Sequence, residues 1–227
     1  MELAPATWPQ VEATGGRSIL ALPLGSLEQH GPHLPLDTDS RVALAVATGL
    51  ATCRLDVAVA PVVAYGASGE HAAFPGTLLV GHHVLADLII ELVRSARHSF
   101  SGVVVISGHG GNADALGTVR RRTTEEGDDV VVWQAAPEHG DAHAGRTETS
   151  LMLAIDPAVV RMEHAEAGCT DPLSDLLPRL RRSGVRPVSS NGVLGDPTGA
   201  NAAEGRAILA GLVHDLVAAV SAHWPAP

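Results

Sequence analysis

Short apolar runs alternate with longer segments of helical periodicity along this chain. The apolar runs are rich in β-branched residues and predict buried strands at 17–24, 56–63, 101–108 and 129–136. Apolar residues spaced by three or four positions predict helices at 40–51, 81–99, 112–126, 147–155 and 200–223. Strands and helices that alternate with short links form a parallel sheet with helices on both faces.

The pattern also predicts how the first helix begins and how many domains the chain forms. Asp39 or Ser40 is expected to cap the N-terminus of the first predicted helix, because short polar side chains accept hydrogen bonds from its free N–H groups. Residues 164–198 are richer in Pro and Gly than the rest of the chain. We expect this segment to be an excursion or an oligomer contact, so that 1–227 forms a single domain.

Composition narrows the classes of partner. The formal net charge of −10 disfavours nucleic acid and anionic membranes. No apolar run reaches the roughly 18 residues of a membrane-spanning helix, and "MELAPATWPQ" lacks the basic start of a signal peptide. Cys53 and Cys169 are isolated and lack metal-binding spacing, which suits a reducing compartment. We therefore expect a cytoplasmic protein.

Each predicted strand is followed by a segment rich in acidic, histidine or glycine residues. These segments lie at 25–40, 65–71, 108–112 and 138–150. Ligands of open α/β sheets bind outside the carboxyl ends of the strands. The predicted sheet therefore brings these segments together although they are far apart in sequence.

Acidic and histidine residues in these segments have the chemistry of metal ligands. Glu28 and His30 are two positions apart, so in extended chain their side chains project to the same side and suit a borderline divalent metal. Asp39 is eleven residues after Glu28, and one carboxylate can bridge two metals about 3.5–4 Å apart. His109 lies between glycines that permit close backbone approach. Glu148 is placed to complete a second metal site.

Other residues of these segments are expected to line the pocket or to support the ligands. Asp37 is a candidate to orient a liganding imidazole. The glycine-rich turn at 108–111 offers N–H groups for a substrate carboxylate or an oxyanion. Glu70 and His71 either line the pocket, form a subunit contact or simply belong to a polar turn. The full set comprises His33, Asp37, Glu70, His71, Gly110, Gly111 and Asn112.

The stretch "LPLGSLEQHGPHLPLDTD" resembles the signature of the creatininase (creatinine amidohydrolase) family. "GASGEHAAFPGT", "SGHGGN" and "HAGRTETS" support the resemblance and occur in family order. The resemblance implies a three-layer α/β/α fold with a mostly parallel central sheet and hydrolysis of a carbon–nitrogen amide bond. It also implies two divalent metal ions, which we expect to be Zn with Fe or Mn, and a homo-oligomer that is hexameric or larger.

The resemblance also assigns ligands. Glu28 and His109 with Asp39 match those of one metal, and His30 with Asp39 matches those of the other. Creatininase proper has a liganding Glu where this chain has Gly111. Either Glu148 supplies the missing ligand or it acts as a base. The absence of the liganding Glu at position 111 disfavours creatinine as the substrate.

Two later segments narrow the resemblance within the family. "DAHAGRTETSLMLAIDP" and "NGVLGDPTGANAAEGRAILAGL" are similar to the mycofactocin-system branch. The resemblance implies a peptidase that removes a Val-Tyr-derived C-terminal piece from a radical-modified precursor peptide. A metal pair bridged by Asp39 would activate water, and His143 is expected to protonate the departing amine. Alternatives are a small-molecule amidohydrolase or deformylase on a cyclic amide or formamide, and a non-catalytic metal-binding subunit.

Overall fold

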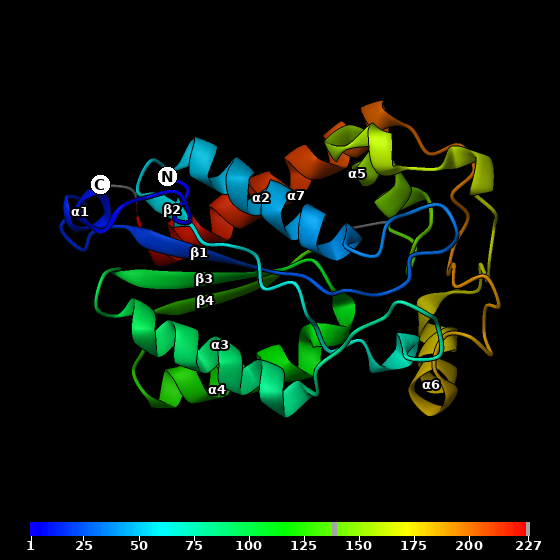
Figure 1. The fold of residues 1–227 in the computed structure, drawn as a ribbon, viewed down its shortest axis with the longest axis horizontal. Helices are drawn as coiled ribbons and strands as arrows, with labels where there is room; N and C mark the ends of the chain where they lie inside the picture. The colour runs from blue at the N-terminus through cyan, green and yellow to red at the C-terminus, as the bar shows by residue number, and fades with distance from the viewer. Residues whose placement is uncertain (138–139, 226–227) are drawn as a thin grey trace.

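Four parallel strands form the centre of the molecule (Figure 1). A computed structural model describes residues 1–137 and 140–225. In sequence order the strands are β1 (Ile19–Leu24), β2 (Val57–Val59), β3 (Gly102–Ser107) and β4 (Val130–Gln134). Their spatial order is β2-β1-β3-β4. The predicted parallel sheet is confirmed.

Helices cover both faces of the sheet (Figure 1). On one face lie α2 (Thr38–Cys53), α5 (Arg146–Ile155) and α7 (Ala202–His223), and on the other lie α3 (His82–Ala96) and α4 (Ala113–Glu125). Successive strand side chains point to opposite faces, so β1 and β3 each supply two cores. Leu22 and Val105 pack with α3 and α4, whereas Ala21 and Val104 pack with α2 and α7. The three-layer α/β/α fold is confirmed.

Two predicted boundaries were wrong. The second strand ends at Val59 and not at position 63, because Pro61 has no N–H for a sheet hydrogen bond. Helix α2 starts at Thr38, so Asp39 and Ser40 lie inside its first turn and do not cap it. Both side chains instead point toward the end of β1, where the Ser40 hydroxyl donates to the Ser26 carbonyl.

The sequence pattern did not predict two helices, α1 (Trp8–Glu12) and α6 (Leu173–Ser183). Helix α6 lies in the excursion at 164–198, contains Pro178 and buries Leu176. The excursion returns to the carboxyl edge of the sheet, where the Val185 N–H donates to the Glu70 carbonyl. Four 3₁₀ turns complete the described elements: η1 (Gly69–His71), η2 (Gly110–Asn112), η3 (Pro157–Val159) and η4 (Met162–His164).

Helix α7 is the one described helix that is long and apolar enough, by length and composition, to cross a membrane. Its buried residues Leu212, Leu216 and Val220 belong to the core beneath α2. Gly205 packs against the main chain of Ser150 in α5, where a Cβ atom would lie 1.8 Å from the carbonyl oxygen. Much of the apolar character of α7 is thus explained by its place in the core.

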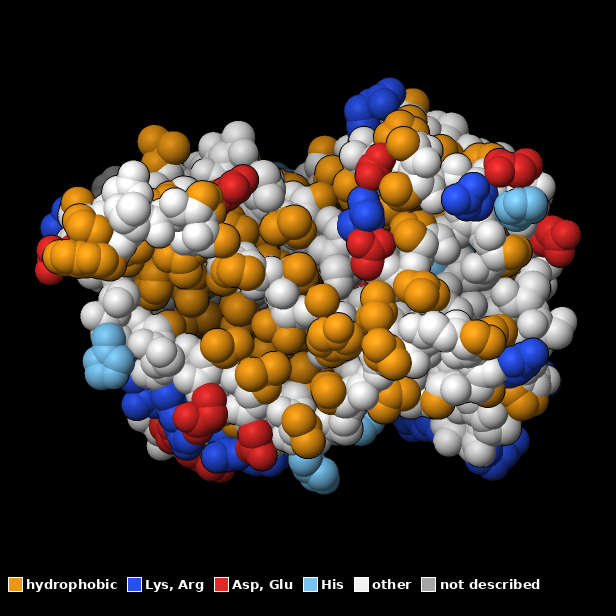
Figure 2. All heavy atoms as spheres, in the orientation of Figure 1, with side chains coloured by type: hydrophobic (Ala, Val, Ile, Leu, Met, Phe, Trp, Pro, Cys, Tyr) orange, Lys and Arg blue, Asp and Glu red, His pale blue; other side chains and the backbone are white. Residues whose placement is uncertain are grey.

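Apolar side chains also gather in a surface hollow between α2 and α3, over the chain that follows β2 (Figure 2). The bordering elements are poor in charge, since no charged residue occurs between Asp56 and Glu70. Exposed large hydrophobic residues of these elements are Leu44, Tyr65, Leu78, Leu79, Val84 and Leu88. We call these six residues the apolar face.

Candidate metal centre

Three acidic and histidine side chains meet where β1 and β3 end. Glu28 follows β1, His109 follows β3, and Asp39 lies in the first turn of α2. His109 Nε2 is 3.1 Å from Glu28 Oε2, and His109 Nδ1 is 3.2 Å from Asp39 Oδ2. One donor atom from each residue lies within 4.8 Å of the other two, and all three residues are buried. We call Glu28, Asp39 and His109 the sheet-edge group.

A second cluster lies on the other side of Asp39. His30 Nε2 is 3.3 Å from Asp39 Oδ1 and 3.8 Å from Glu148 Oε2. His143 joins them, and the donor atoms of His30, His143 and Glu148 also lie within 4.8 Å of one another. We call these three residues the α5 group. Asp39 thus directs one oxygen toward each group, which is the arrangement of a bridging carboxylate.

Close backbone approach sets the position of Asp39. At Gly25 a Cβ atom would lie 2.2 Å from Ser40 Oγ, and at Gly108 it would lie 2.3 Å from the Asp39 carbonyl oxygen. Only glycine fits where the ends of β1 and β3 meet the start of α2. The Ser26 hydroxyl then donates to Asp39 Oδ2 over 2.5 Å. This hydrogen bond orients the carboxylate between the two groups.

The α5 group depends on the turn before α5. Ala144 has φ of 51°, the only positive φ among the non-glycine residues that the structure describes. This left-handed conformation is costly for alanine and places its N–H 2.6 Å from Glu148 Oε2. His143 pairs with Leu194 of the excursion in an isolated antiparallel bridge. The turn therefore holds both side chains through main-chain contacts.

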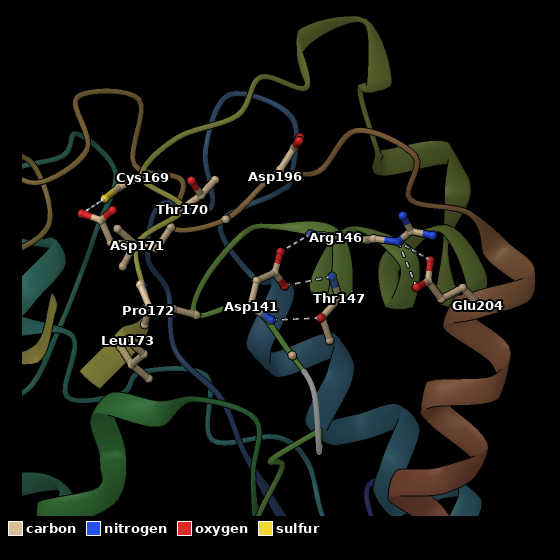
Figure 3. Close-up of a pocket in the computed structure, with 14 residues that line it drawn as sticks. Asp141, Arg146, Thr147, Cys169, Thr170, Asp171, Pro172, Leu173, Asp196 and Glu204 are labelled. Atoms are coloured by element: carbon tan, nitrogen blue, oxygen red, sulfur yellow. Dashed lines mark hydrogen bonds and ion pairs between the residues drawn. The ribbon is translucent and has the colours of Figure 1, made fainter. Parts of the chain in front are cut away.

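Asp141 anchors the same turn at the N-terminus of α5 (Figure 3). Its carboxylate accepts hydrogen bonds from the N–H groups of Arg146 and Thr147, the latter over 3.0 Å. A cavity of about 460 Å³ lies beside it, lined in part by Cys169 and Leu173. None of the six residues of the sheet-edge and α5 groups lines this cavity. It flanks the turn and is separate from the clustered ligands.

Burial and charge pairing shape the protonation of these groups. Burial disfavours charge on His30, but the Asp39 carboxylate overrides it and raises the His30 pKa to about 10. For His109, burial is likewise overridden by Glu28 and Asp39, which raise its pKa to about 10. Burial would raise the pKa of Asp39, yet the two imidazoles hold it well below the usual range. Without a metal, protons on imidazoles balance the negative charge.

The two glutamates are buried carboxylates whose negative charge a bound cation would balance. Burial raises the pKa of Glu28 and of Glu148 to about 7. Across the residues described, neither oxygen of Glu28 accepts a well-aligned hydrogen bond, although both are buried. Such groups normally have partners, and a bound cation satisfies a carboxylate fully. A mixed carboxylate and imidazole set suits Zn, Mn or Fe.

The structure places the remaining predicted residues at different distances from the centre. Asp37 does not orient a histidine as expected, because its side chain is 41% exposed and pairs with Arg41 over 2.8 Å. His33 Nε2 lies 2.8 Å from the Thr149 hydroxyl, next to Glu148 in sequence. The Asn112 amide accepts from the Ala67 N–H and donates to the Gly25 carbonyl. Asn112 therefore ties together the loops that carry the candidate ligands.

Gly111 and Glu70 share one space beside His109. A Cβ atom at Gly111 would lie 2.4 Å from His109 Nε2 and 2.5 Å from Glu70 Oε1. The Glu70 carboxylate is partly exposed and lies 3.7 Å from His109 Nε2. Gly110 is exposed at the start of η2. This side of the centre is its more open side.

Sequence reasoning missed Gln29, which contacts two histidines of the centre. Its side-chain nitrogen lies 2.8 Å from His71 Nδ1 and 3.0 Å from His143 Nε2. Its position between Glu28 and His30 was the available signal. An extended segment points this side chain away from its neighbours, so the contact with residue 143 was invisible in the sequence.

The chain is similar to known proteins over nearly its whole length. The family model for creatininase, described as creatinine amidohydrolase, matches residues 4–220. The chain is 47% identical to the mycofactocin precursor peptide peptidase of Mycobacterium tuberculosis (strain H37Rv), covering 100% of this chain and 93% of the relative. It is 46% identical to the protein of that name in Mycobacterium ulcerans, covering 98% and 89%.

Solved structures of creatininase share the fold of this chain. A creatininase described as "Creatininase Mn" and a mutant creatininase described as "Zn-Zn type" are each 27% identical to this chain. Each superposes with a TM-score of 0.79 and covers 99% of this chain and 98% of its own. The described metals agree with a centre built from carboxylates and imidazoles.

Proposed function

This chain belongs to the creatininase family, and on that premise we propose that it is a metal-dependent peptidase of mycofactocin biosynthesis. Its substrate is a radical-modified precursor peptide, from which it releases the Val-Tyr-derived C-terminal dipeptide core. Relatives that are 46% and 47% identical over nearly the whole chain carry the name of that peptidase, which supports this substrate. Its membership of an amidohydrolase family supports cleavage of an amide bond. Its two free cysteines support a reducing, cytoplasmic location.

The orientation of Asp39 carries the proposal for two metals. In the proposed assignment Glu28, Asp39 and His109 hold one ion, and His30, Asp39 and Glu148 hold the other. Zn with Fe or Mn suits these donors. When bound, such a pair polarises the scissile carbonyl and lowers the pKa of water toward neutrality.

The surrounding side chains handle protons and orientation. His143 lies within 4.8 Å of the donors of His30 and Glu148, so it can take a proton at the attacking oxygen and deliver it to the departing amine. The Ala144 N–H holds Glu148 in its ligand position. Gly110 and Gly111 lie on the open side of the centre, where their N–H groups can face the substrate carbonyl or carboxylate, and the buried Asn112 holds this turn against the neighbouring loops.

The test is direct cleavage of the modified precursor peptide. The purified chain, loaded in turn with Zn²⁺, Mn²⁺ and Fe²⁺, is incubated with the peptide, and mass spectrometry follows the C-terminal dipeptide. We expect release with at least one metal. Absence of cleavage with all three metals contradicts the proposal.

Two neighbouring aspartates provide a matched pair of variants. Asp39→Ala removes the shared carboxylate and is expected to slow release by on the order of 10³-fold. Asp37→Ala removes a partly exposed ion pair, which costs roughly 1 kcal/mol of stability or less, and is expected to leave release intact. If the protein were a non-catalytic metal-binding subunit, Asp39→Ala would lose metal while the wild type still showed no turnover.

A small cyclic amide is the second candidate substrate, because Glu28 and His30 are completely buried. Such closure suits a compact molecule better than a peptide. Creatinine and a formamide are assayed alongside the peptide under the same metal loading. Turnover of either small amide with an inert peptide would favour this second function.

We also propose that the protein is a homo-oligomer, hexameric or larger, that associates through the apolar face. Two copies with a net charge of −10 repel each other, and this face is the surface on which few carboxylates oppose contact. Val84→Asp on α3 places a charge on a side chain that is 60% exposed. Light scattering should show a smaller particle for this variant and an unchanged one for Leu177→Asp on α6. An unchanged mass for Val84→Asp contradicts this interface.

A further inference from the structure

Helix α6 and the residues after it carry a run of positive charge in a chain that is negative overall. No acidic residue occurs between Asp175 and Asp196, yet four of the fifteen basic residues of the chain fall in that interval. All four are exposed arginines: Arg179, Arg181, Arg182 and Arg186. Around α6, at the lower right of the view, Figure 2 shows arginine side chains and no carboxylates. We call these four residues the basic face.

The basic face differs from the other arginine-rich surface of the molecule in its pairing. Near the C-terminal ends of α3 and α4, three arginines each form an ion pair with a carboxylate: Arg94, Arg97 and Arg122. Within residues 1–137 and 140–225, no arginine of the basic face forms such a pair. Asp175 lies one turn before Arg179, but its carboxylate accepts from the Ser174 hydroxyl over 3.2 Å. The charge of the basic face is therefore available to carboxylates of a partner.

Main-chain contacts hold the C-terminal end of α6 against the open side of the candidate metal centre. The Val185 N–H donates to the Glu70 carbonyl over 2.8 Å. Gly184 approaches the same oxygen so closely that a Cβ atom would lie 2.7 Å from it. The side chain of Glu70 borders His109 on the open side. The basic face therefore begins where a peptide chain that leaves the centre by this side reaches the surface.

Arg186 is held in place before any partner binds. Its guanidinium donates to the Ala73 carbonyl over 2.6 Å and lies 5.3 Å from the centre of the Phe74 ring. A guanidinium group has five N–H donors, so most of them remain for a carboxylate. A side chain that is already ordered loses less conformational entropy when it binds. Arg186 is therefore a preformed anchor at the end of the basic face.

The charge of the whole chain decides which kind of anion suits the basic face. A membrane or a nucleic acid presents negative charge over a wide area, which the net charge of −10 on this protein opposes. An extended peptide is narrow, and salt screens its carboxylates from acidic residues that lie more than about 8 Å away. Such a peptide interacts mainly with the local arginines. The basic face therefore fits an acidic peptide.

We propose that the basic face binds acidic residues of the substrate peptide on the N-terminal side of the scissile bond. This assignment rests on the proposed function, in which that bond lies near the C-terminus of the peptide. Only the C-terminal end then enters the buried centre, and the longer remainder leaves by the open side and crosses α6. The arginines form ion pairs with this remainder and touch no reacting atom. They select the substrate and do not take part in the chemistry.

Two synthetic peptides test the basic face without any cleavage. Both end in Val-Tyr, and one carries a run of glutamates before this end where the other carries glutamines. Fluorescence anisotropy measures the Kd of each peptide for the zinc-loaded protein. At about 0.05 M NaCl we expect the glutamate peptide to bind about tenfold more tightly, because several exposed ion pairs each add a small gain, and this preference should shrink at about 0.5 M NaCl. Equal affinity for the two peptides at low salt overturns the proposal.

Two triple variants locate the binding on α6. The α6 variant combines Arg179→Gln, Arg181→Gln and Arg182→Gln. The α4 variant removes the same charge from another helix and is the matched control: Arg120→Gln, Arg121→Gln and Arg122→Gln. The Kd of the glutamate peptide should rise about tenfold in the α6 variant and stay within about twofold in the α4 variant. An equal loss in both variants overturns the proposal, because net charge alone would then explain the binding.

Cleavage of the modified precursor peptide separates affinity from chemistry. In the α6 variant KM should rise about tenfold while kcat stays within about twofold. A fall in kcat at unchanged KM contradicts the assignment. An inert wild type that still prefers the glutamate peptide would mean that the peptidase proposal fails and the basic face stands.

Two further measurements separate the peptide from other occupants of the basic face. Light scattering of the α6 variant should give the same particle mass as the wild type, and a smaller mass would show that the face joins copies of this chain. Vesicles that contain phosphatidylserine should not retain the wild type, and retention that the α6 variant loses would show a membrane surface. Either of these contrary results overturns the proposal.

Discussion

The two candidate ligand groups that meet at Asp39 are built in different ways. The sheet-edge group stands on β1, β3 and the first turn of α2, and Glu28, Asp39 and His109 are almost completely buried. The α5 group takes His143 and Glu148 from a turn with a strained alanine, held by an excursion far away in sequence. A rigid sheet fixes one half of the centre, and a tethered turn fixes the other. The second half is therefore held by contacts outside the sheet.

Removing Asp39 tests whether the two groups are one centre. Asp39→Ala takes one carboxylate oxygen from each group, so we expect loss of both metals. The rate should fall by on the order of 10³-fold, since metal ions supply several kcal/mol of transition-state stabilisation. Elemental analysis counts the metals per chain, and peptide cleavage gives the rate. Retention of one tightly bound metal would show that the groups are independent.

Glu28→Ala and Glu148→Ala separate the groups. Each is expected to remove one metal and leave the other, because in the proposed assignment each glutamate holds one ion only. The expected loss of rate is on the order of 10²-fold or more in both. Glu148→Ala should leave the midpoint of unfolding nearly unchanged. Glu28→Ala should lower that midpoint, because it leaves a cavity at the edge of the sheet. Loss of both metals in Glu148→Ala would mean that the α5 group organises the whole site.

Gly205→Ala tests whether the packing of α7 against α5 holds the α5 group in place. A Cβ atom at this position would lie 1.8 Å from the Ser150 carbonyl oxygen and must push α7 away from α5. We expect destabilisation of about 2 kcal/mol from overpacking. Metal binding by the α5 group should weaken more than that by the sheet-edge group. Urea unfolding and metal titration measure the two effects, and Gly211→Ala is the control, because nothing lies within 4 Å of its added Cβ.

The smallest expected change in stability is at the amino end of the sheet, and this change depends on pH. Arg54 forms two hydrogen bonds with Asp56, and these bonds lower the pKa of Asp56 below its ordinary value. Its stabilising contribution is therefore complete above the unfolded pKa of about 3.9 and is lost as pH falls toward the lower folded pKa. Asp56→Asn should cost roughly 1 kcal/mol at pH 7 and less near pH 3, where part of the contribution has been lost. Urea unfolding at both pH values checks this, and an equal cost at both would contradict it.

Strand and helix patterns were strong enough to predict most of the fold. The four strands, five of the helices and the parallel arrangement follow from residues that are apolar in runs or at helical spacing. Helix α6 was missed because Pro178 and the surrounding polar residues hide its short apolar stripe. The start of α2 was missed because Asp39 resembles a cap, although its carboxylate contacts His30 and His109.

The candidate ligands were proposed from sequence, but their contacts belong to the tertiary structure. Residue types and motif order identify five candidate ligands, Glu28, His30, Asp39, His109 and Glu148. All five remain part of the proposed centre. Asp37 has the same chemistry as Asp39 and lies two positions away, yet it faces Arg41 and the solvent. Helical geometry separates the two side chains, and sequence alone does not show which one faces the sheet.

By itself the sequence determined the strands, the helices, the family and the chemical types at the carboxyl edge of the sheet. These follow from local preferences and from short motifs. Only the tertiary structure decided that Asp39 lies between two groups, that Gln29 joins His71 to His143, and that Glu70 occupies the space beside Gly111. Each of these contacts joins segments that are separated in sequence, and their distances depend on how the layers pack. Packing is a property of the whole chain, so no local pattern can encode it.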